Sequence, residues 1–290
     1  MQQIDPADLF SDPVERSRIS AEAAFGLNEI RDAFEALPVG ARVLEVGCGT
    51  GFLLASLAGL RPDLSLFGLE PLGKGFAAFE TTLARIEAAF GNLTIYRVGV
   101  EDFALPDGEE PFDMIFSINV FEHLDDWPRA VANTATLLAP GGRMIVLCPN
   151  YAVPYEPHFG IPIIGGPKWT RRLFARHIDK IEQKNNARGL WDSLNFITAP
   201  ALRRECRRLG IDLAFDKGVM ARMLMRLDSD AEFRNRQAAV TGVARLLRMF
   251  GVGALFQRLP AALSPYMKAI VKRPDATSGA MLQDAGGLPL

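Results

Sequence analysis

Three glycines, each separated by one residue, follow a short apolar run near the start of the chain. The run is 41–46, and the glycines are Gly47, Gly49 and Gly51. Glycines between a strand and a helix let the backbone approach a ligand closely, and the first helical turn offers free amides. In an open α/β sheet, ligands bind at this end of the strands. The pattern predicts a ligand site or, as the alternative, a tight turn that binds nothing.

A carboxylate after the second apolar run narrows the choice of ligand. Residues 64–69 are typical of a strand, and Glu70 follows it, 19 residues after Gly51. A carboxylate at this place accepts hydrogen bonds from ribose hydroxyls. Phe52 stands where the nicotinamide fingerprint has its third glycine, which disfavours pyrophosphate recognition. Together these features indicate a nucleoside ligand.

The elements that must position these residues alternate between helix and strand. Apolar residues recur at helical spacing from about residue 27, and five short apolar runs are separated by helical segments. The runs cover 41–46, 64–69, 93–98, 113–118 and 144–147. Such alternation predicts an α/β fold: a Rossmann-like, doubly wound, mostly parallel sheet with helices on both faces and right-handed crossovers.

The segments around these residues resemble the class I S-adenosylmethionine-dependent methyltransferases, in particular the small-molecule enzymes of the ubiquinone-biosynthesis type. The similar segments are the loop 43–51, Glu70, 100–103, 112–124 and the turn 138–143. The resemblance implies S-adenosyl-L-methionine as the cofactor. It implies as cofactor-binding residues Glu45, Gly47, Cys48, Gly49, Gly51, Glu70, Glu101, Asp102 and Asn119.

Two positions depart from the pattern of that family. Many of its members have an aspartate where Gly99 stands, so either Glu101 or Asp102 would have to hold the adenine amino group. Some quinone O-methyltransferases carry an extra acid ahead of the Glu–His pair and are thought to use a metal. This chain has Asn119 there, and we therefore expect no metal.

Histidines are the candidates for catalysis. The sulfonium already activates its methyl group, so positioning and desolvation dominate an in-line displacement. A base is needed only where the acceptor must lose a proton. His158 would face the substrate if the aromatic insertion around it, which includes Trp169, forms a lid. His123 follows the active-site loop, and packing or capping is the alternative role for each, whereas His177 is expected in neither role.

The chain beyond residue 149 adds segments to the catalytic domain. We expect an N-terminal segment 1–26, a methyltransferase domain 27–218 with a lid insertion 149–197, and a helical insertion 219–265. A last strand at 266–273 and a disordered tail at 274–290 complete the prediction.

The two halves of the chain differ in charge. Residues 1–150 carry 22 acids and 10 bases, and residues 151–290 carry 12 acids and 22 bases. A basic, apolar segment such as 219–265 can contact an anionic membrane, and a helical cap on the core is its alternative. The segment lacks the pattern expected for reading nucleic acid, so no nucleic-acid partner is expected.

The chain shows neither a leader nor a run of 18 apolar residues, and its three cysteines are far apart. We expect a cytoplasmic enzyme, with peripheral contact at the inner membrane face as a variant. The predicted function is methyl transfer from S-adenosylmethionine to a small or lipophilic acceptor, at oxygen. The alternatives are a nicotinamide-dependent oxidoreductase on the same sheet and a non-catalytic cofactor-binding module.

Overall fold

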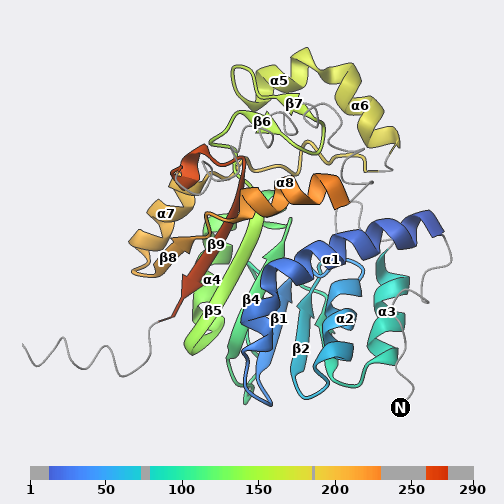
Figure 1. The fold of residues 1–290 in the computed structure, drawn as a ribbon, viewed down its shortest axis with the longest axis vertical. Helices are drawn as coiled ribbons and strands as arrows, with labels where there is room; N and C mark the ends of the chain where they lie inside the picture. Colours follow the sequence, from blue (N-terminus) through green and yellow to red (C-terminus); the bar gives the residue numbers. More distant parts are fainter. Residues whose placement is uncertain (1–12, 73–78, 185–186, 230–258, 274–290) are drawn as a thin grey trace, which may run out of the picture.

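The computed structural model describes residues 13–72, 79–184, 187–229 and 259–273. Its centre is a seven-stranded sheet with the order β3-β2-β1-β4-β5-β9-β8 (Figure 1). Strands β1 to β5 are parallel, and β9 is antiparallel to both of its neighbours. The strands are β1 Arg42–Val46, β2 Ser65–Leu69, β3 Leu93–Tyr96, β4 Phe112–Ile118, β5 Leu138–Pro149, β8 Asp212–Phe215 and β9 Tyr266–Lys272. The expected mostly parallel α/β sheet is confirmed, and β9 corresponds to the strand predicted at 266–273.

Helices cover both faces of the sheet. One buried cluster joins the sheet to α1, α2, α3 and α8, and a second cluster joins the opposite face to α4 and α7 (Figure 1). The strands between them are buried on both sides, which explains their continuous apolar runs. The helices are α1 Pro13–Glu35, α2 Phe52–Leu60, α3 Glu80–Ala89, α4 Trp127–Leu137, α7 Ala199–Arg208 and α8 Val219–Ser229.

The first helix begins earlier than the sequence pattern indicated. Helix α1 covers part of the expected N-terminal segment 1–26, and its residues Ile19, Ala23 and Phe25 are buried. Polar residues separate these three in the sequence, so their spacing does not mark a helix. Position 19 lies in the core through contact with other elements, which a local pattern does not show.

Helix α8 is the described part of the segment 219–265. Val219, Met220 and Leu224 are buried, so this part of the segment packs on the core. Arg222 of α8 also donates to Glu29 of α1 at 2.7 and 2.6 Å, and Glu29 is 4% exposed. Residues 230–258 and the tail 274–290 lie outside the described residues. None of the described helices is long and apolar enough to cross a membrane.

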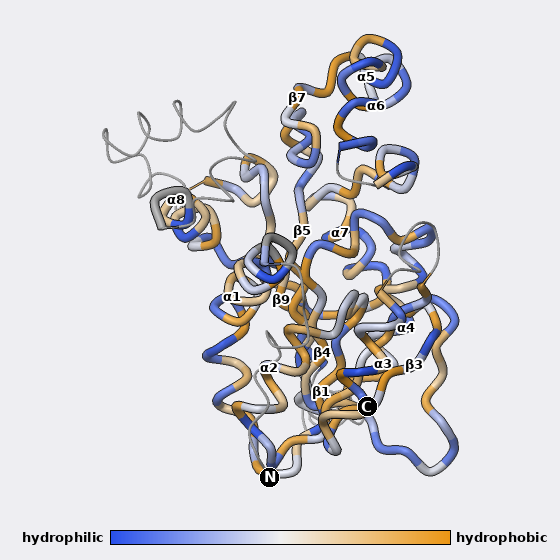
Figure 2. Tube along the Cα trace, turned by 90° about the vertical axis from the view of Figure 1, so that its right-hand side faces the viewer, coloured by the Kyte–Doolittle hydropathy of each residue, from blue (hydrophilic) through white to orange (hydrophobic). Residues whose placement is uncertain are grey.

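The insertion after β5 forms a small subdomain above the sheet. It contains the two-stranded sheet β6 Tyr155–Glu156 and β7 Ile161–Pro162, and the helices α5 Pro167–Leu173 and α6 Ala175–Lys184 (Figure 1). Figure 2 shows it at the top of the molecule, above the strands and their hydrophobic residues. It has its own buried cluster, made up of Tyr151, Phe159, Ile161, Ile178, Trp191 and Leu194. This subdomain corresponds to the insertion predicted as a lid, and it carries His158.

Candidate active site

The glycine-rich turn connects β1 to α2. Its glycines, Gly47, Gly49 and Gly51, have φ values of 72°, 55° and 75°, which non-glycine residues adopt at a cost. A Cβ on Gly47 would lie 2.5 Å from the side chain of Val120, whereas a Cβ on Gly49 would find Phe79 at 3.8 Å as its nearest neighbour. Glycine is therefore required at 47 by packing and at 49 by the backbone angle.

Glu70 lies at the end of β2, against the glycine turn. Its Oε2 accepts the backbone N–H of Gly49 at 2.8 Å, and its Oε1 accepts that of Leu72 at 3.1 Å. Burial raises the pKa of the Glu70 carboxyl, and these two hydrogen bonds oppose the rise. Each oxygen retains a second lone pair, so the carboxylate can still accept hydrogen bonds from a ribose.

Glu45 of β1 is buried beside the same turn. It is 4% exposed, and its Oε2 has no hydrogen-bond partner within the described structure. Burial, and then repulsion from Glu70, raises the pKa of the Glu45 carboxyl to about 8. A buried carboxyl without a partner is costly unless a donor or a cation meets it. The amino group and the sulfonium of S-adenosylmethionine are cationic, so the buried carboxyl of Glu45 fits the expected cofactor.

The two acids predicted near adenine differ in their surroundings, and their role toward adenine stays a prediction. Asp102 is turned to solvent, where it pairs with Arg129 at 2.8 Å and its side chain is 68% exposed. Glu101 is half-buried, and its Oε2 would lie 3.1 Å from a Cβ placed on Gly99. Glu101 thus lies beside Gly99, and its Oε1 accepts the backbone N–H of Asp126 at 3.5 Å.

Asn119 and Cys48 lie in the turns that follow β4 and β1, and the backbone of each forms a hydrogen bond there. Asn119 follows β4 with φ 56°, donates its N–H to Leu147, and accepts the hydroxyl of Tyr266 at its Oδ1. The thiol of Cys48 is buried, and its backbone N–H donates to Leu69. Both residues shape the turns beyond the strands, and Asn119 links β4 to β9.

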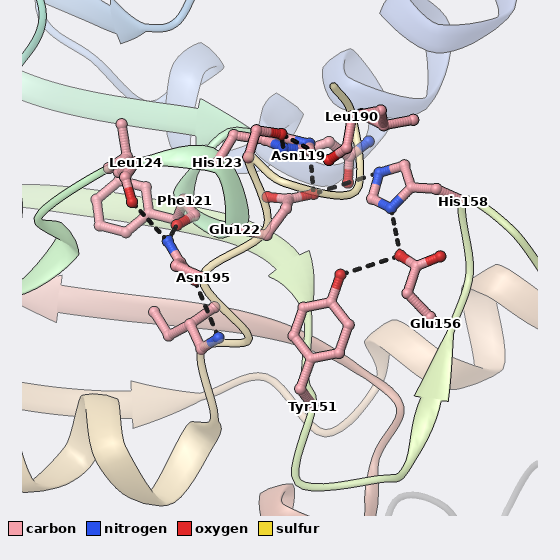
Figure 3. Close-up of polar contacts among 12 residues, drawn as sticks. Asn119, Phe121, Glu122, His123, Leu124, Tyr151, Glu156, His158, Leu190 and Asn195 are labelled. Carbon is pink, nitrogen blue, oxygen red and sulfur yellow. Dashed lines mark hydrogen bonds and ion pairs between the residues drawn. The ribbon is translucent and has the colours of Figure 1, made fainter. Parts of the chain in front are cut away.

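The loop after β4 brings a second set of residues next to the glycine turn. Val120 packs on Gly47, and the short 3-10 helix η3 Phe121–His123 follows it directly. Asn195, near the end of the insertion 149–197, donates to two carbonyl oxygens of this loop at 2.7 and 2.9 Å (Figure 3). The loop is thus fixed between the cofactor side and the lid.

His158 reaches this loop from the lid. Its Nδ1 lies 2.6 Å from Oε1 of Glu156, which also accepts the hydroxyl of Tyr151 at 3.1 Å (Figure 3). The other oxygen of Glu156 accepts the N–H of Phe159 at 2.7 Å. A carboxylate only accepts hydrogen bonds, so Nδ1 of His158 carries a proton in this contact.

His123 is oriented in the same way. Its Nδ1 lies 2.8 Å from the hydroxyl of Ser193, and that hydroxyl donates its own hydrogen to Leu190. The serine oxygen must therefore accept from Nδ1, and in the neutral ring Nε2 of His123 carries the lone pair. Burial, followed by repulsion from His158, lowers the pKa of His123 to about 3, so the ring is neutral at pH 7. The two rings lie 5.3 Å apart, centre to centre.

Glu122 lies between the two histidines. Its Oε1 is 4.0 Å from Nε2 of His123 and 3.9 Å from Nε2 of His158. The side chain is fully buried, and neither oxygen has a hydrogen-bond partner within the described structure. Burial raises the pKa of Glu122 to about 7, while the neighbouring His158 opposes the rise. The ligand atoms of these three residues all lie within 4.8 Å of one another.

The structure brings the two predicted histidines together although 35 residues separate them in the chain. Trp169, expected near the substrate, lies on α5 and is 64% exposed. His177 is exposed and contacts the carbonyl of Phe159. The sequence analysis missed Glu122 and Glu156. Each stands within two residues of a predicted histidine, which was a usable signal, but their meeting depends on how the lid folds back over β4.

Comparisons with known proteins identify the family of the chain. A family model described as a methyltransferase domain matches residues 19–214. An uncharacterised protein of Mycobacterium tuberculosis is 35% identical over 252 residues, covering 86% of this chain and 84% of that protein. A ubiquinone biosynthesis O-methyltransferase of Brucella abortus is 33% identical over 135 residues, which are 46% of this chain and 50% of that protein.

Among solved structures, phosphoethanolamine N-methyltransferase 2 of Haemonchus contortus, in complex with S-adenosyl-L-methionine, gives a TM-score of 0.51 at 15% identity. The match covers 85% of this chain and 52% of that chain, and it shows the fold alone. No finding supports a nicotinamide-dependent oxidoreductase. With S-adenosyl-L-methionine as its cofactor, the chain belongs to the class I S-adenosylmethionine-dependent methyltransferases.

Proposed function

We propose that this enzyme transfers the methyl group of S-adenosylmethionine to a hydroxyl oxygen of a small acceptor. In this step the carbon–sulfur bond breaks, a carbon–oxygen bond forms, and the hydroxyl proton leaves. The observation that carries the proposal is the position of His158 and His123. Both imidazoles lie at the loop next to the glycine turn, where Nδ1 of His158 contacts Glu156 and Nδ1 of His123 contacts Ser193.

His158 is the proposed acceptor of that proton. Its contact with Glu156 fixes the tautomer and would stabilise the imidazolium once Nε2 is protonated. His123 is a weaker base because its pKa is lowered to about 3. The proposal that oxygen rather than nitrogen is methylated takes further support from the name of the Brucella relatives, ubiquinone biosynthesis O-methyltransferase. This chain spans only half of their length.

The proposed acceptor is partly apolar. Aromatic side chains pack together in the insertion that carries His158, with Phe196 4.9 Å from Tyr151 and 5.5 Å from Trp191, centre to centre. Apolar walls exclude water from the reacting groups and favour an acceptor with apolar surface. Contact of 219–265 with the inner membrane face remains a prediction, as does the cytoplasmic location.

The experiment is a transfer assay with the full chain, methyl-labelled S-adenosylmethionine and paired acceptors that differ only in hydroxyl or amino group. We expect label in the hydroxyl compounds as a methyl ether, together with stoichiometric S-adenosylhomocysteine. Label in the amino compounds alone would contradict O-methylation. Tight cofactor binding without transfer to any acceptor would instead support the non-catalytic module.

A further inference from the structure

We infer that the groove between α7 and the 3-10 helix η4 Ala261–Leu263 binds a small soluble ligand through a diphosphate group. The groove has a volume of about 610 Å³, and residues of α7, of η4 and of β8 line it. Figure 1 shows α7 beside β8, which is the edge strand of the sheet. Sites for small molecules commonly have volumes of about 300–1,000 Å³. The residues assigned above to the cofactor and the acceptor do not line this groove, so it is a second site.

The groove is positively charged. Four cationic side chains line it, all of them exposed, and no acidic side chain of the described residues does. These groove cations are Arg203, Arg204 and Arg207 of α7 and Lys217 of the loop after β8. Like charges three and four positions apart on one helix destabilise it. An anion bound in the groove would relieve the repulsion between Arg203 and Arg207, which stand four positions apart.

The acids nearest to these cations in the sequence are paired with other bases. Glu205 of α7 lies 2.6 Å from Arg208, which is not part of the groove. Asp216, beside the groove lysine, lies 2.7 Å from Arg222 and 3.4 Å from Lys268. In the part of the chain that the structure describes, the groove cations form no ion pair. The positive charge of the groove is therefore available to an anionic ligand.

The two walls of the groove are held together from within. Asn150, which is 1% exposed, accepts the backbone N–H of Ala199 at 2.8 Å and donates to the carbonyl of Ala261 at 2.9 Å. Both alanines line the groove, one on α7 and one on η4. The guanidinium of Arg203 lies over the ring of Phe215, 5.2 Å from its centre, and this cation–π contact orients it. A site that is already formed loses less freedom on binding.

The chemistry of the groove cations favours phosphate groups. Guanidinium groups bind phosphate oxygens through paired hydrogen bonds, and a lysine ammonium binds them as a point charge. One phosphate monoester carries a charge of about −1.5 to −2 at pH 7, so it leaves part of the positive charge of the groove uncompensated. Two linked phosphates match four cations more closely. Sites for small molecules are concave, whereas a bilayer presents a flat surface, so the groove suits a soluble ligand.

The test is a calorimetric titration of the full chain with inorganic pyrophosphate at about 0.15 M salt, where exposed charges are screened. Sulfate and vesicles that contain an anionic phospholipid are titrated in separate arms. We expect one equivalent of pyrophosphate to bind, and sulfate to bind more weakly. Arg204→Gln and Arg207→Gln should each weaken pyrophosphate binding about fivefold or more. Arg208→Gln is the matched control, because it removes the same charge from the same helix outside the groove, and it should bind like the parent.

No binding at millimolar pyrophosphate, or equal binding by the parent, Arg204→Gln and Arg207→Gln, would overturn the inference. Equal affinity for sulfate would show a general anion site and refute the diphosphate. Binding to the anionic vesicles without binding of pyrophosphate would assign the groove to a membrane surface instead. The affinity of each variant for S-adenosylhomocysteine checks its fold. The titration uses no methyl acceptor, so its outcome is independent of the proposed O-methylation.

Discussion

The carboxylate of Glu70 accepts the backbone N–H of Gly49 at 2.8 Å, which joins the end of β2 to the glycine turn after β1. The acid proposed for the ribose therefore also holds the turn that approaches the cofactor. The other oxygen of Glu70 accepts the backbone N–H of Leu72, so the side chain holds both the glycine turn and the segment that follows β2.

Replacing Glu70 by alanine should weaken the binding of S-adenosylhomocysteine by about 1–3 kcal/mol, because the ribose hydroxyls lose a charged acceptor. Calorimetric titration of parent and variant measures the difference. Glu80→Ala is a suitable control, since that glutamate lies on α3 with a half-exposed side chain. Unchanged affinity in Glu70→Ala would place the ribose elsewhere.

Gly47→Ala should destabilise the fold by about 2 kcal/mol or more, because it combines a left-handed backbone with a contact of 2.5 Å to Val120. Adding Val120→Ala should recover part of the loss, since it removes the contact but not the backbone strain. Gly59→Ala within α2, where a Cβ meets nothing within 4 Å, should be neutral or stabilising. Urea unfolding gives all three values, and a Gly47→Ala variant as stable as the parent would refute the packing argument.

Glu45 predicts a pH dependence of stability. Its pKa is raised to about 8 in the folded chain and is near 4.5 unfolded, so the unfavourable contribution starts above pH 4.5 and grows until about pH 8. Glu45→Gln cannot ionise and should gain stability over the parent across this window, by about 2–4 kcal/mol at its upper end. Unfolding free energies of both proteins at pH 5, 7 and 9 test this. A difference that is independent of pH would show that Glu45 is ionised in the fold.

His158→Ala should lower turnover about 10²-fold or more and leave the affinity for S-adenosylhomocysteine nearly intact. The reason is that His158 belongs to the acceptor side and contacts Glu156 and Glu122 rather than the glycine turn. His177→Ala should retain parental turnover. If His158→Ala loses stability and both ligands together, His158 is a packing residue of the lid.

Much of the fold follows from local patterns. The apolar runs predicted β1 to β5 because strands buried on both faces need apolar residues throughout. Glu70 was predicted as a site residue because its place after β2 is set by the local alternation of elements. The early start of α1 was not predicted, since Ile19 is buried by contacts that its neighbours in sequence do not reveal.

The acceptor side could be predicted only in part. His158 and His123 stood out as polar residues in suitable segments, but the position of His158 depends on how the lid folds over β4. Glu122 stands out because it is buried between the rings of His123 and His158, and this placement depends on the tertiary structure. Asp102 looked equivalent to Glu101, and only the ion pair with Arg129 shows that it faces solvent.

The central claim is that the glycine turn, Glu45 and Glu70 bind S-adenosylmethionine as the cofactor of a methyltransferase. Calorimetric titration of the full chain with S-adenosylhomocysteine, with NADH titrated in parallel, tests it most directly. We predict binding of one equivalent of S-adenosylhomocysteine and weaker binding of NADH. Absence of S-adenosylhomocysteine binding at millimolar ligand, or tighter binding of NADH, would contradict it.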